Sequence, residues 1–330
     1  MVTQRRRQIN TSTPITAELP LVIVNPKSAG GSTKDNWAGI ASDLRAHFGA
    51  YNVAFTKTAG DGITLAKRAC ESGRTFIIAC GGDGTINEIA NGILQSGVDV
   101  ELGIMPSGTG GDFRRTLDMP QSPREAARAL RDGITKLIDV GRVTFQSHGD
   151  ETVSRYFLNV SSFGLAASII ERVKSTKALD WLPLGSVRGR ASFALSTLQE
   201  VVGLDFATVR VKIDGGDEKL LNTINFCVAN ARYFGGGMKI APDAKINDGF
   251  LDVINIGDIR TAKIILNAYT LYAGTHLDLK EVKSTLAERI EVSPASKDVE
   301  IHLETDGELP GKLPALFEIV PNALRVRVPK

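Results

Sequence analysis

The chain has 330 residues, more than twice the usual size of one domain, so we expect two domains. Hydrophobic residues make up 42% and charged residues 23%, a balance that excludes a collagen, a coiled coil and a wholly disordered chain. The formal net charge of +2 is too small to indicate a nucleic-acid partner, and we expect none.

The N-terminus and the cysteines indicate where the protein works. Residues 1–18 contain a basic cluster without the apolar segment of a secretory signal, so we expect a flexible basic tail. Cys70, Cys80 and Cys227 show no metal-ligand spacing, and Cys80 and Cys227 lie in apolar runs. We therefore expect these cysteines to be small core residues and the protein to lie in a reducing, cytoplasmic compartment.

Short apolar runs alternate with helical patterns in the first part of the chain. The predicted strands cover residues 21–24, 53–55, 75–80 and 102–105. Each is followed by a segment whose apolar residues recur at helical spacing, as in Ile63, Ala66 and Ala69. This βαβ alternation predicts a parallel sheet covered by helices on both faces. We assign residues 19–142 to this Rossmann-like, three-layer α/β domain.

From residue 143 onward the segments are mostly short and rich in β-formers. Turn signals such as Asp214-Gly215-Gly216 and Asp248-Gly249 separate them. This pattern predicts an antiparallel β-sandwich domain over residues 143–330. Two helical insertions interrupt it, near residues 164–202 and 259–274.

Four loops follow the predicted parallel strands, at residues 25–31, 56–62, 81–85 and 106–112. The carboxyl ends of parallel strands meet at one edge of a sheet, where ligands bind. Three of these loops are rich in Gly, Ser and Thr, so their backbone N–H groups can approach a phosphate. The helix that follows each loop adds the positive end of its dipole. These features predict a phosphate site at this edge.

Two alternatives to a phosphate site are open. A single Gly-Gly-Asp-Gly sequence can be only a turn, and Thr85 with Glu88 forms a capping box that can simply start a helix. Neither a Walker P-loop nor a dinucleotide fingerprint follows a strand. Several aspartates lie near the glycine loops, and one or two carboxylates can hold Mg²⁺ together with phosphate oxygens. We therefore favour phosphoryl transfer from a nucleotide.

The sequence resembles the diacylglycerol-kinase-like lipid kinases, which include soluble bacterial diacylglycerol kinases, sphingosine and ceramide kinases, and which are related more distantly to NAD kinases. The resemblance rests on VNPKSAGG, CGGDGTINEIANGI, IMPSGTGGDF, FLNVSSFGLAA, ANARYFGGGMKIAPDAKINDGFLDV and ETDGELPG, in this order. It implies an ATP-binding α/β domain and a lipid-binding β-sandwich domain, with the active site in the cleft between them. The implied reaction moves the γ-phosphate of ATP to a hydroxyl of diacylglycerol or a related lipid.

The resemblance also implies residue roles. Nucleotide contacts are expected from Asn25, Lys27, Thr56, Gly82, Asp83, Gly84, Thr85, Asn87, Glu88 and Thr109. The acidic network for the catalytic Mg²⁺ would be Asp83, Asp112 and Asp139. A second, structural Mg²⁺ would be bound by the Asp248 carboxylate and the backbone carbonyls of Lys245 and Phe250.

The base that takes the proton of the lipid hydroxyl is expected from Asp306 and Glu308. The residues alone leave the choice open, because Asp306-Gly307 is also a strong hairpin-turn signal. We favour Glu308, with Asp306 in support. The chain departs from its relatives at Gly111, where they usually carry Asn, while it keeps the following Asp112.

Two questions about partners stay open at this stage. Basic residues surround an apolar group that includes Trp181, within residues 172–190, and this composition fits either peripheral contact with a membrane or a solvated helix pair. The sequence also leaves open whether the protein forms a homodimer. The alternatives to a lipid kinase are an NAD kinase-like phosphotransferase and a non-catalytic nucleotide or lipid sensor.

Overall fold

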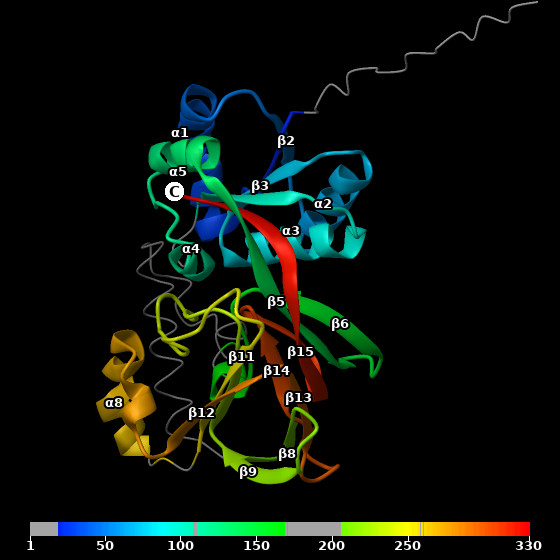
Figure 1. The fold of residues 1–330 in the computed structure, drawn as a ribbon, viewed down its shortest axis with the longest axis vertical. Helices are drawn as coiled ribbons and strands as arrows, with labels where there is room; N and C mark the ends of the chain where they lie inside the picture. The colour runs from blue at the N-terminus through cyan, green and yellow to red at the C-terminus, as the bar shows by residue number, and fades with distance from the viewer. Residues whose placement is uncertain (1–18, 108–110, 169, 171–205, 258, 260) are drawn as a thin grey trace, which may run out of the picture.

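The computed structural model describes the chain except residues 1–18, 108–110, 169, 171–205, 258 and 260. The predicted basic tail and the basic–apolar segment at residues 172–190 lie outside the described residues. Two stacked parts are visible in Figure 1, one with helices around a sheet and one built mainly of strands. This arrangement confirms an α/β part followed by a β-sandwich.

A parallel sheet forms the centre of the first part. Its strands lie in the order β4-β3-β1-β2, all parallel, and are β1 (Leu21–Val24), β2 (Asn52–Phe55), β3 (Phe76–Gly81) and β4 (Glu101–Pro106). Every residue of β3 is buried, as expected for a strand covered on both faces. The position of β3 between two neighbours therefore explains its continuous apolar sequence.

Helices cover both faces of this sheet. The helices are α1 (Ser32–His47), α2 (Asp61–Glu71), α3 (Asp83–Ser96), α4 (Asp112–Thr116) and α5 (Pro123–Asp132), with a 3₁₀ turn at Ser28–Gly31. α1 packs beside α5, and α2 packs beside α3 (Figure 1). α1 begins directly after one of the loops predicted to bind phosphate, and α2 and α3 begin within such loops, so their N-termini gather at one edge.

The second part consists of antiparallel strands around an aromatic core. Its strands are β5 (Ile134–Ser147), β6 (Thr152–Phe157), β7 (Val160–Gly164), β8 (Ala207–Ile213), β9 (Lys219–Thr223), β10 (Asn225–Ala229), β11 (Leu251–Ile256), β12 (Val282–Ala287), β13 (Arg289–Pro294), β14 (His302–Thr305) and β15 (Glu308–Val328). Its buried cluster includes Phe145, Phe157, Phe163, Phe226 and Phe317. α8 (Thr261–Ala273) and a 3₁₀ turn at His276–Asp278 lie between β11 and β12, and α8 agrees with the predicted insertion near residues 259–274.

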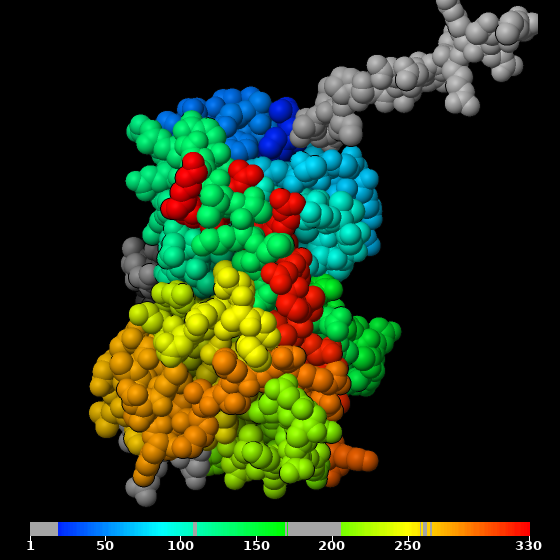
Figure 2. Space-filling view, viewed as in Figure 1, coloured from blue at the N-terminus to red at the C-terminus, as the bar shows by residue number. Residues whose placement is uncertain are grey.

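The last strand returns to the first part of the molecule. β15 runs antiparallel to β5, and near its end Arg325 and Val326 pair in parallel with β4. Leu324, Val326 and Val328 belong to the core of the α/β part. Figure 2 shows this red segment passing along the surface from one part to the other. This return was not expected from the sequence, and the division at residue 142 stays a prediction.

The cysteines behave as expected of core residues. Cys70, Cys80 and Cys227 are all buried and free. Burial raises the pKa of the Cys80 thiol to about 12, so this side chain is an unreactive thiol at neutral pH. None of the helices that the structure describes is long and apolar enough to cross a membrane.

Candidate active site

Hydrogen bonds join three of the four predicted loops at the edge of the parallel sheet. The Asn25 side-chain amide donates to the Thr85 hydroxyl at 3.0 Å, and the Ser28 hydroxyl lies 3.3 Å from the same oxygen. The Thr33 and Ser107 hydroxyls are 2.7 Å apart. These contacts confirm that the loops after β1, β3 and β4 meet, as the sequence predicts.

The N-terminus of α3 is open to an anion. α3 begins at Asp83 with Gly82 as its N-cap, so no side chain caps it. Within the described residues, the backbone N–H groups of Asp83, Gly84 and Thr85 have no hydrogen-bond acceptor. A Cβ added at Gly82 or Gly84 would meet no atom within 4 Å. Such free donors at the positive end of a helix suit a phosphate.

The capping-box alternative for Thr85 and Glu88 is wrong. Thr85 lies inside α3, and the Glu88 carboxylate accepts hydrogen bonds from the backbone N–H groups of Gly60 and Gly62, at 2.8 and 2.9 Å. Glu88 therefore caps α2 rather than α3, because these N–H groups belong to the start of α2. This leaves the N-terminus of α3 free.

Asp83 and Asp112 share one polar site. The Asp83 carboxylate accepts the backbone N–H groups of Asp112 and Phe113, both at 3.1 Å. The Asp112 carboxylate binds Arg115 at 2.7 Å and the backbone N–H of Gly236 at 2.8 Å. Burial raises the pKa of Asp112, and the nearby Asp83 charge adds to the effect while Arg115 opposes it. A cation between the two carboxylates would relieve this repulsion.

Asp139 lies apart from these contacts. Its buried carboxylate accepts the backbone N–H groups of Gly249 and Asn322, each at 2.8 Å. It therefore fastens β5 to the turn before β11 and to β15. The described residues contain no group of three or more His, Cys, Asp or Glu side chains that could hold a metal ion. Asp83 and Asp112 still fit Mg²⁺, since this ion often takes only one or two carboxylates beside phosphate oxygens.

The predicted structural cation site lies in the turn before β11. The backbone N–H of Phe250 donates to the Asp248 carboxylate at 3.2 Å. Burial raises the pKa of Asp252 to about 6, and the charges of Asp248 and Asp243 add to this shift. Negative charge thus gathers around Asp248. Such surroundings fit a hard cation that also takes the backbone carbonyls of Lys245 and Phe250.

Asp306 anchors the turn between β14 and β15. Asp306 and Gly307 have φ angles of +47° and +87°, which are typical of a two-residue hairpin turn. The Asp306 carboxylate accepts four hydrogen bonds: from the backbone N–H groups of Leu158 (2.7 Å), Asn159 (3.0 Å) and Val160 (3.1 Å), and from the Asn87 amide (2.7 Å). Desolvation raises its pKa to about 6 despite these donors, and the Asp83 charge adds to the rise.

Glu308 is the more accessible of the two candidate bases. Its side chain is 44% exposed, and among the residues that the structure describes it forms one ion pair, with Arg155 at 2.8 Å. Asp306 has its acceptor positions filled, whereas Glu308 keeps one oxygen without a partner among the described residues. A hydroxyl can therefore approach Glu308 more readily than Asp306.

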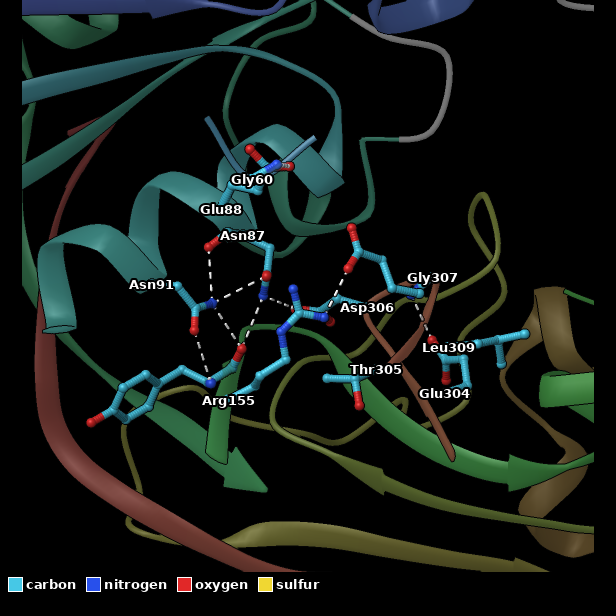
Figure 3. A network of polar contacts seen from close by, with 12 residues as sticks. Gly60, Asn87, Glu88, Asn91, Arg155, Glu304, Thr305, Asp306, Gly307 and Leu309 are labelled. Carbon is cyan, nitrogen blue, oxygen red and sulfur yellow. Dashed lines mark hydrogen bonds and ion pairs between the residues drawn. The ribbon is translucent and has the colours of Figure 1, made fainter. Parts of the chain in front are cut away.

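Two asparagines on α3 connect the α/β part to β6. The Asn87 amide donates to Asp306 and also to the Tyr156 carbonyl, at 3.1 Å. Asn91, one turn later, donates to the same carbonyl and accepts the Tyr156 N–H, each at 3.0 Å (Figure 3). Neither Asn91 nor Arg155 was expected from the sequence. The signal for Asn91 was its position four residues after Asn87, which places the two amides on the same side of α3, beside the apolar stripe.

Lys27 and Thr56 lie on the loops that follow β1 and β2. The exposed Lys27 donates its ammonium group to the Lys57 carbonyl at 2.9 Å, beside the loop after β2. Thr56 is buried, and its N–H binds the Val24 carbonyl. Thr109 lies outside the described residues.

Gly111 has a φ of +67°, a conformation that favours glycine, and it is the N-cap of α4. The nucleotide and metal roles remain predictions.

Comparison with known proteins assigns the chain to a family. Residues 20–143 match the family model described as "Diacylglycerol kinase catalytic domain", and residues 160–328 match "YegS C-terminal NAD kinase beta sandwich-like domain". The diacylglycerol kinase of Bacillus subtilis (strain 168) is 30% identical over 312 residues, which are 94% of this chain and 96% of that protein. The diacylglycerol kinase of Mycobacterium tuberculosis (strain ATCC 25618 / H37Rv) is 29% identical over 328 residues, 99% and 97% of the two chains.

A solved structure gives the same result for the fold. A crystal structure from Bacillus anthracis str. Sterne matches with a TM-score of 0.72 and 27% identity, covering 94% of this chain and 97% of that one. The chain therefore belongs to the diacylglycerol-kinase-like lipid kinases, and it is a phosphotransferase.

The different contacts of Asp306 and Glu308 lead to different mutational effects. Asp306→Asn places an NH₂ group against backbone N–H donors, so we expect a loss of about 2–3 kcal/mol in the free energy of unfolding. Glu308→Gln breaks one half-exposed ion pair, so its unfolding free energy should change by less than about 1 kcal/mol while turnover falls. Chemical denaturation and a kinase assay on both variants check this. Equal stability losses in the two variants would contradict the assignment.

Proposed function

We propose that this enzyme transfers the γ-phosphate of ATP, with Mg²⁺, to a hydroxyl of diacylglycerol or a closely related lipid. The observation that carries the proposal is the placement of an accessible carboxylate, Glu308, on the same rigid network as the open N-terminus of α3. Two relatives that match more than nine-tenths of this chain are named diacylglycerol kinases, which supports this acceptor class.

The phosphates of the nucleotide bind at the N-terminus of α3. The free N–H groups of Asp83, Gly84 and Thr85 donate to phosphate oxygens, and the bonds between Asn25, Ser28 and Thr85 hold the surrounding loops in place. Mg²⁺ bound by Asp83 and Asp112 would supply positive charge to the phosphate oxygens. Asp83 keeps α4 in position through its two backbone contacts.

Glu308 accepts the proton of the lipid hydroxyl. A neutral alcohol is a weak nucleophile, and a carboxylate within hydrogen-bond reach can take its proton as the new bond forms. Asp306 holds the turn that carries Glu308 against α3, so the acceptor and the phosphate donor approach each other on a fixed frame. Positioning of this kind accounts for much of the catalysis in phosphoryl transfer.

The acceptor lipid lies in a bilayer, so the enzyme requires a surface that contacts one. On α8, Leu266, Tyr269 and Tyr272 are 74%, 68% and 55% exposed, and the helix contains no acidic residue. Their spacing of three residues places them on one side of the helix. Figure 2 shows the segment that contains α8 at the lower left surface. Leu and Tyr in such a position suit the membrane interface.

The α8 surface is connected to the polar site. The Lys239 N–H donates to the Leu271 carbonyl of α8 at 2.7 Å. Three residues earlier in the same loop, the Gly236 N–H reaches the Asp112 carboxylate. A lipid that arrives at α8 therefore lies one loop away from Asp112.

A transfer assay tests the proposed reaction. Purified protein with γ-labelled ATP and Mg²⁺ is given diacylglycerol in mixed micelles, and NAD in a separate reaction. We expect label in the lipid and none in NAD, a loss of at least about 100-fold in Asp83→Ala, and loss of transfer with EDTA. Asp132→Ala, an exposed residue at the end of α5, is the matched control. Label in NAD alone would contradict the proposal.

A vesicle assay tests the membrane contact. Replacing Leu266, Tyr269 and Tyr272 together by Ser should reduce co-sedimentation with lipid vesicles by about tenfold, because three apolar side chains leave the interface. Activity on a short-chain lipid in solution should be retained. The control is Leu220→Ser, a 65% exposed residue on β9. Unchanged sedimentation of the triple variant would place the membrane contact elsewhere.

A further inference from the structure

Among the described residues, Arg155 forms the one ion pair of the candidate base. It lies on β6, and its Nη1 is 2.8 Å from Oε2 of Glu308, on the first residue of β15. The two residues are 153 positions apart in the sequence, so only the fold brings them together. Figure 3 shows Arg155 extending from β6 toward Asp306 and Asn87. The guanidinium therefore belongs to the same polar network as the turn between β14 and β15.

The backbone around Arg155 is held from two sides. Arg155 pairs with Val143 of β5 in the sheet. The next residue, Tyr156, uses both its N–H and its carbonyl to bind asparagine side chains of α3. α3 begins at Asp83, where the phosphate is expected. The base of the Arg155 side chain is thus fixed relative to the phosphate site.

Stability gives only a weak reason for this pair. The side chains of Arg155 and Glu308 are 30% and 44% exposed, and ion pairs in such positions contribute little to folding. Within the described residues, Arg155 uses one of its five N–H donors, and Glu308 uses one of its two oxygens. The pair therefore leaves acceptor capacity on Glu308 while fixing the direction of its carboxylate.

We infer that Arg155 is a positioning residue, which holds Glu308 by Oε2 and leaves Oε1 to accept the proton of the lipid hydroxyl. This inference rests on the proposed lipid kinase function. In the step, the hydroxyl O–H bond breaks and its proton passes to Oε1 of Glu308. The hydroxyl oxygen bonds to the γ-phosphorus while the bond from that phosphorus to the bridging oxygen breaks, and its electron pair leaves on ADP.

The planar guanidinium is important to this role. It presents its donors in a fixed fork, whereas a lysine ammonium is a flexible point charge. Arg155→Lys should keep the attraction to Glu308 but hold its carboxylate less firmly. We therefore expect Lys to restore part of the activity that Arg155→Met loses.

The experiment compares variants in the labelled-ATP assay with diacylglycerol. Arg155→Met should lower kcat by about 10- to 100-fold, with the KM for ATP changed by less than about twofold. Arg155→Lys should lie between Arg155→Met and the wild type. In a Glu308→Gln background, Arg155→Met should cause little further loss, because Arg155 acts through Glu308. Thermal unfolding of each variant should stay near that of the wild type.

Arg142→Met is the matched control. Arg142 lies on β5, and its pair with Glu318 of β15 has a similar distance, 2.9 Å, and side chains that are 42% and 23% exposed. It stands opposite Tyr156 in the ladder, so its side chain lies on the other face of the sheet from Arg155. We expect wild-type kcat from this variant.

Three results would overturn the inference. One is an unchanged kcat in Arg155→Met while the wild type transfers phosphate. Another is a large rise in the KM for ATP with kcat retained, which would make Arg155 a nucleotide ligand. The third is an equal fold-loss of kcat from Arg155→Met in the wild-type and in the Glu308→Gln background. A wild-type protein that phosphorylates no lipid would instead overturn the proposed function, and this inference with it.

Discussion

The arrangement of the site depends on the four hydrogen bonds accepted by the Asp306 carboxylate. Three come from the consecutive backbone N–H groups of residues 158–160, which connect β6 to β7 and begin β7, and the fourth comes from Asn87 on α3. Hydrogen bonds to an ionised carboxylate are stronger than neutral ones, and these also satisfy backbone groups that would otherwise be left unpaired. One side chain thus joins the α/β part, the strand connection and the β14–β15 turn.

This constraint gives two neighbouring acidic residues different tasks. Asp306 has no accessible acceptor position left, so its contribution is to hold the turn at the start of α3. Glu308, two residues later, is half-exposed and faces Arg155. The surroundings of each carboxylate, rather than its chemical type, determine which one anchors the site and which one is available to a hydroxyl. Asp112 and Asp139 also differ in their surroundings. Asp112 lies beside the charge of Asp83, whereas Asp139 binds backbone N–H groups and fastens β15.

Much of the α/β part was predictable from local sequence. The buried strand at residues 76–81 and the glycine loop after it follow from a continuous apolar run that ends in permissive residues. The hairpin turn at Asp306-Gly307 also follows from its residues. Asp306 both forms this turn and anchors it through its carboxylate. These features depend on neighbours in the chain, so periodicity and turn chemistry reveal them.

The remaining features depend on contacts between distant segments. Asn87 and Asp306 are separated by 219 positions, and Arg155 and Glu308 by 153. No periodic pattern encodes such pairs, so the anchoring role of Asp306 and the position of Arg155 were missed. The contacts of Asp139 were unpredictable for the same reason, because this carboxylate binds backbone groups 110 and 183 residues away, while its role at the catalytic cation stays a prediction. The return of β15 to β4 is likewise a pairing of distant strands.

Amide hydrogen exchange with and without Mg²⁺ and ATP tests whether the nucleotide binds at the open N-terminus of α3, on a frame fixed by Asp306. We expect Mg²⁺ and ATP to slow exchange at the amides of Asp83, Gly84 and Thr85, whereas the amides of residues 158–160 should exchange slowly in both conditions. Unchanged exchange at Asp83–Thr85, or fast exchange at residues 158–160 in the free protein, would contradict it.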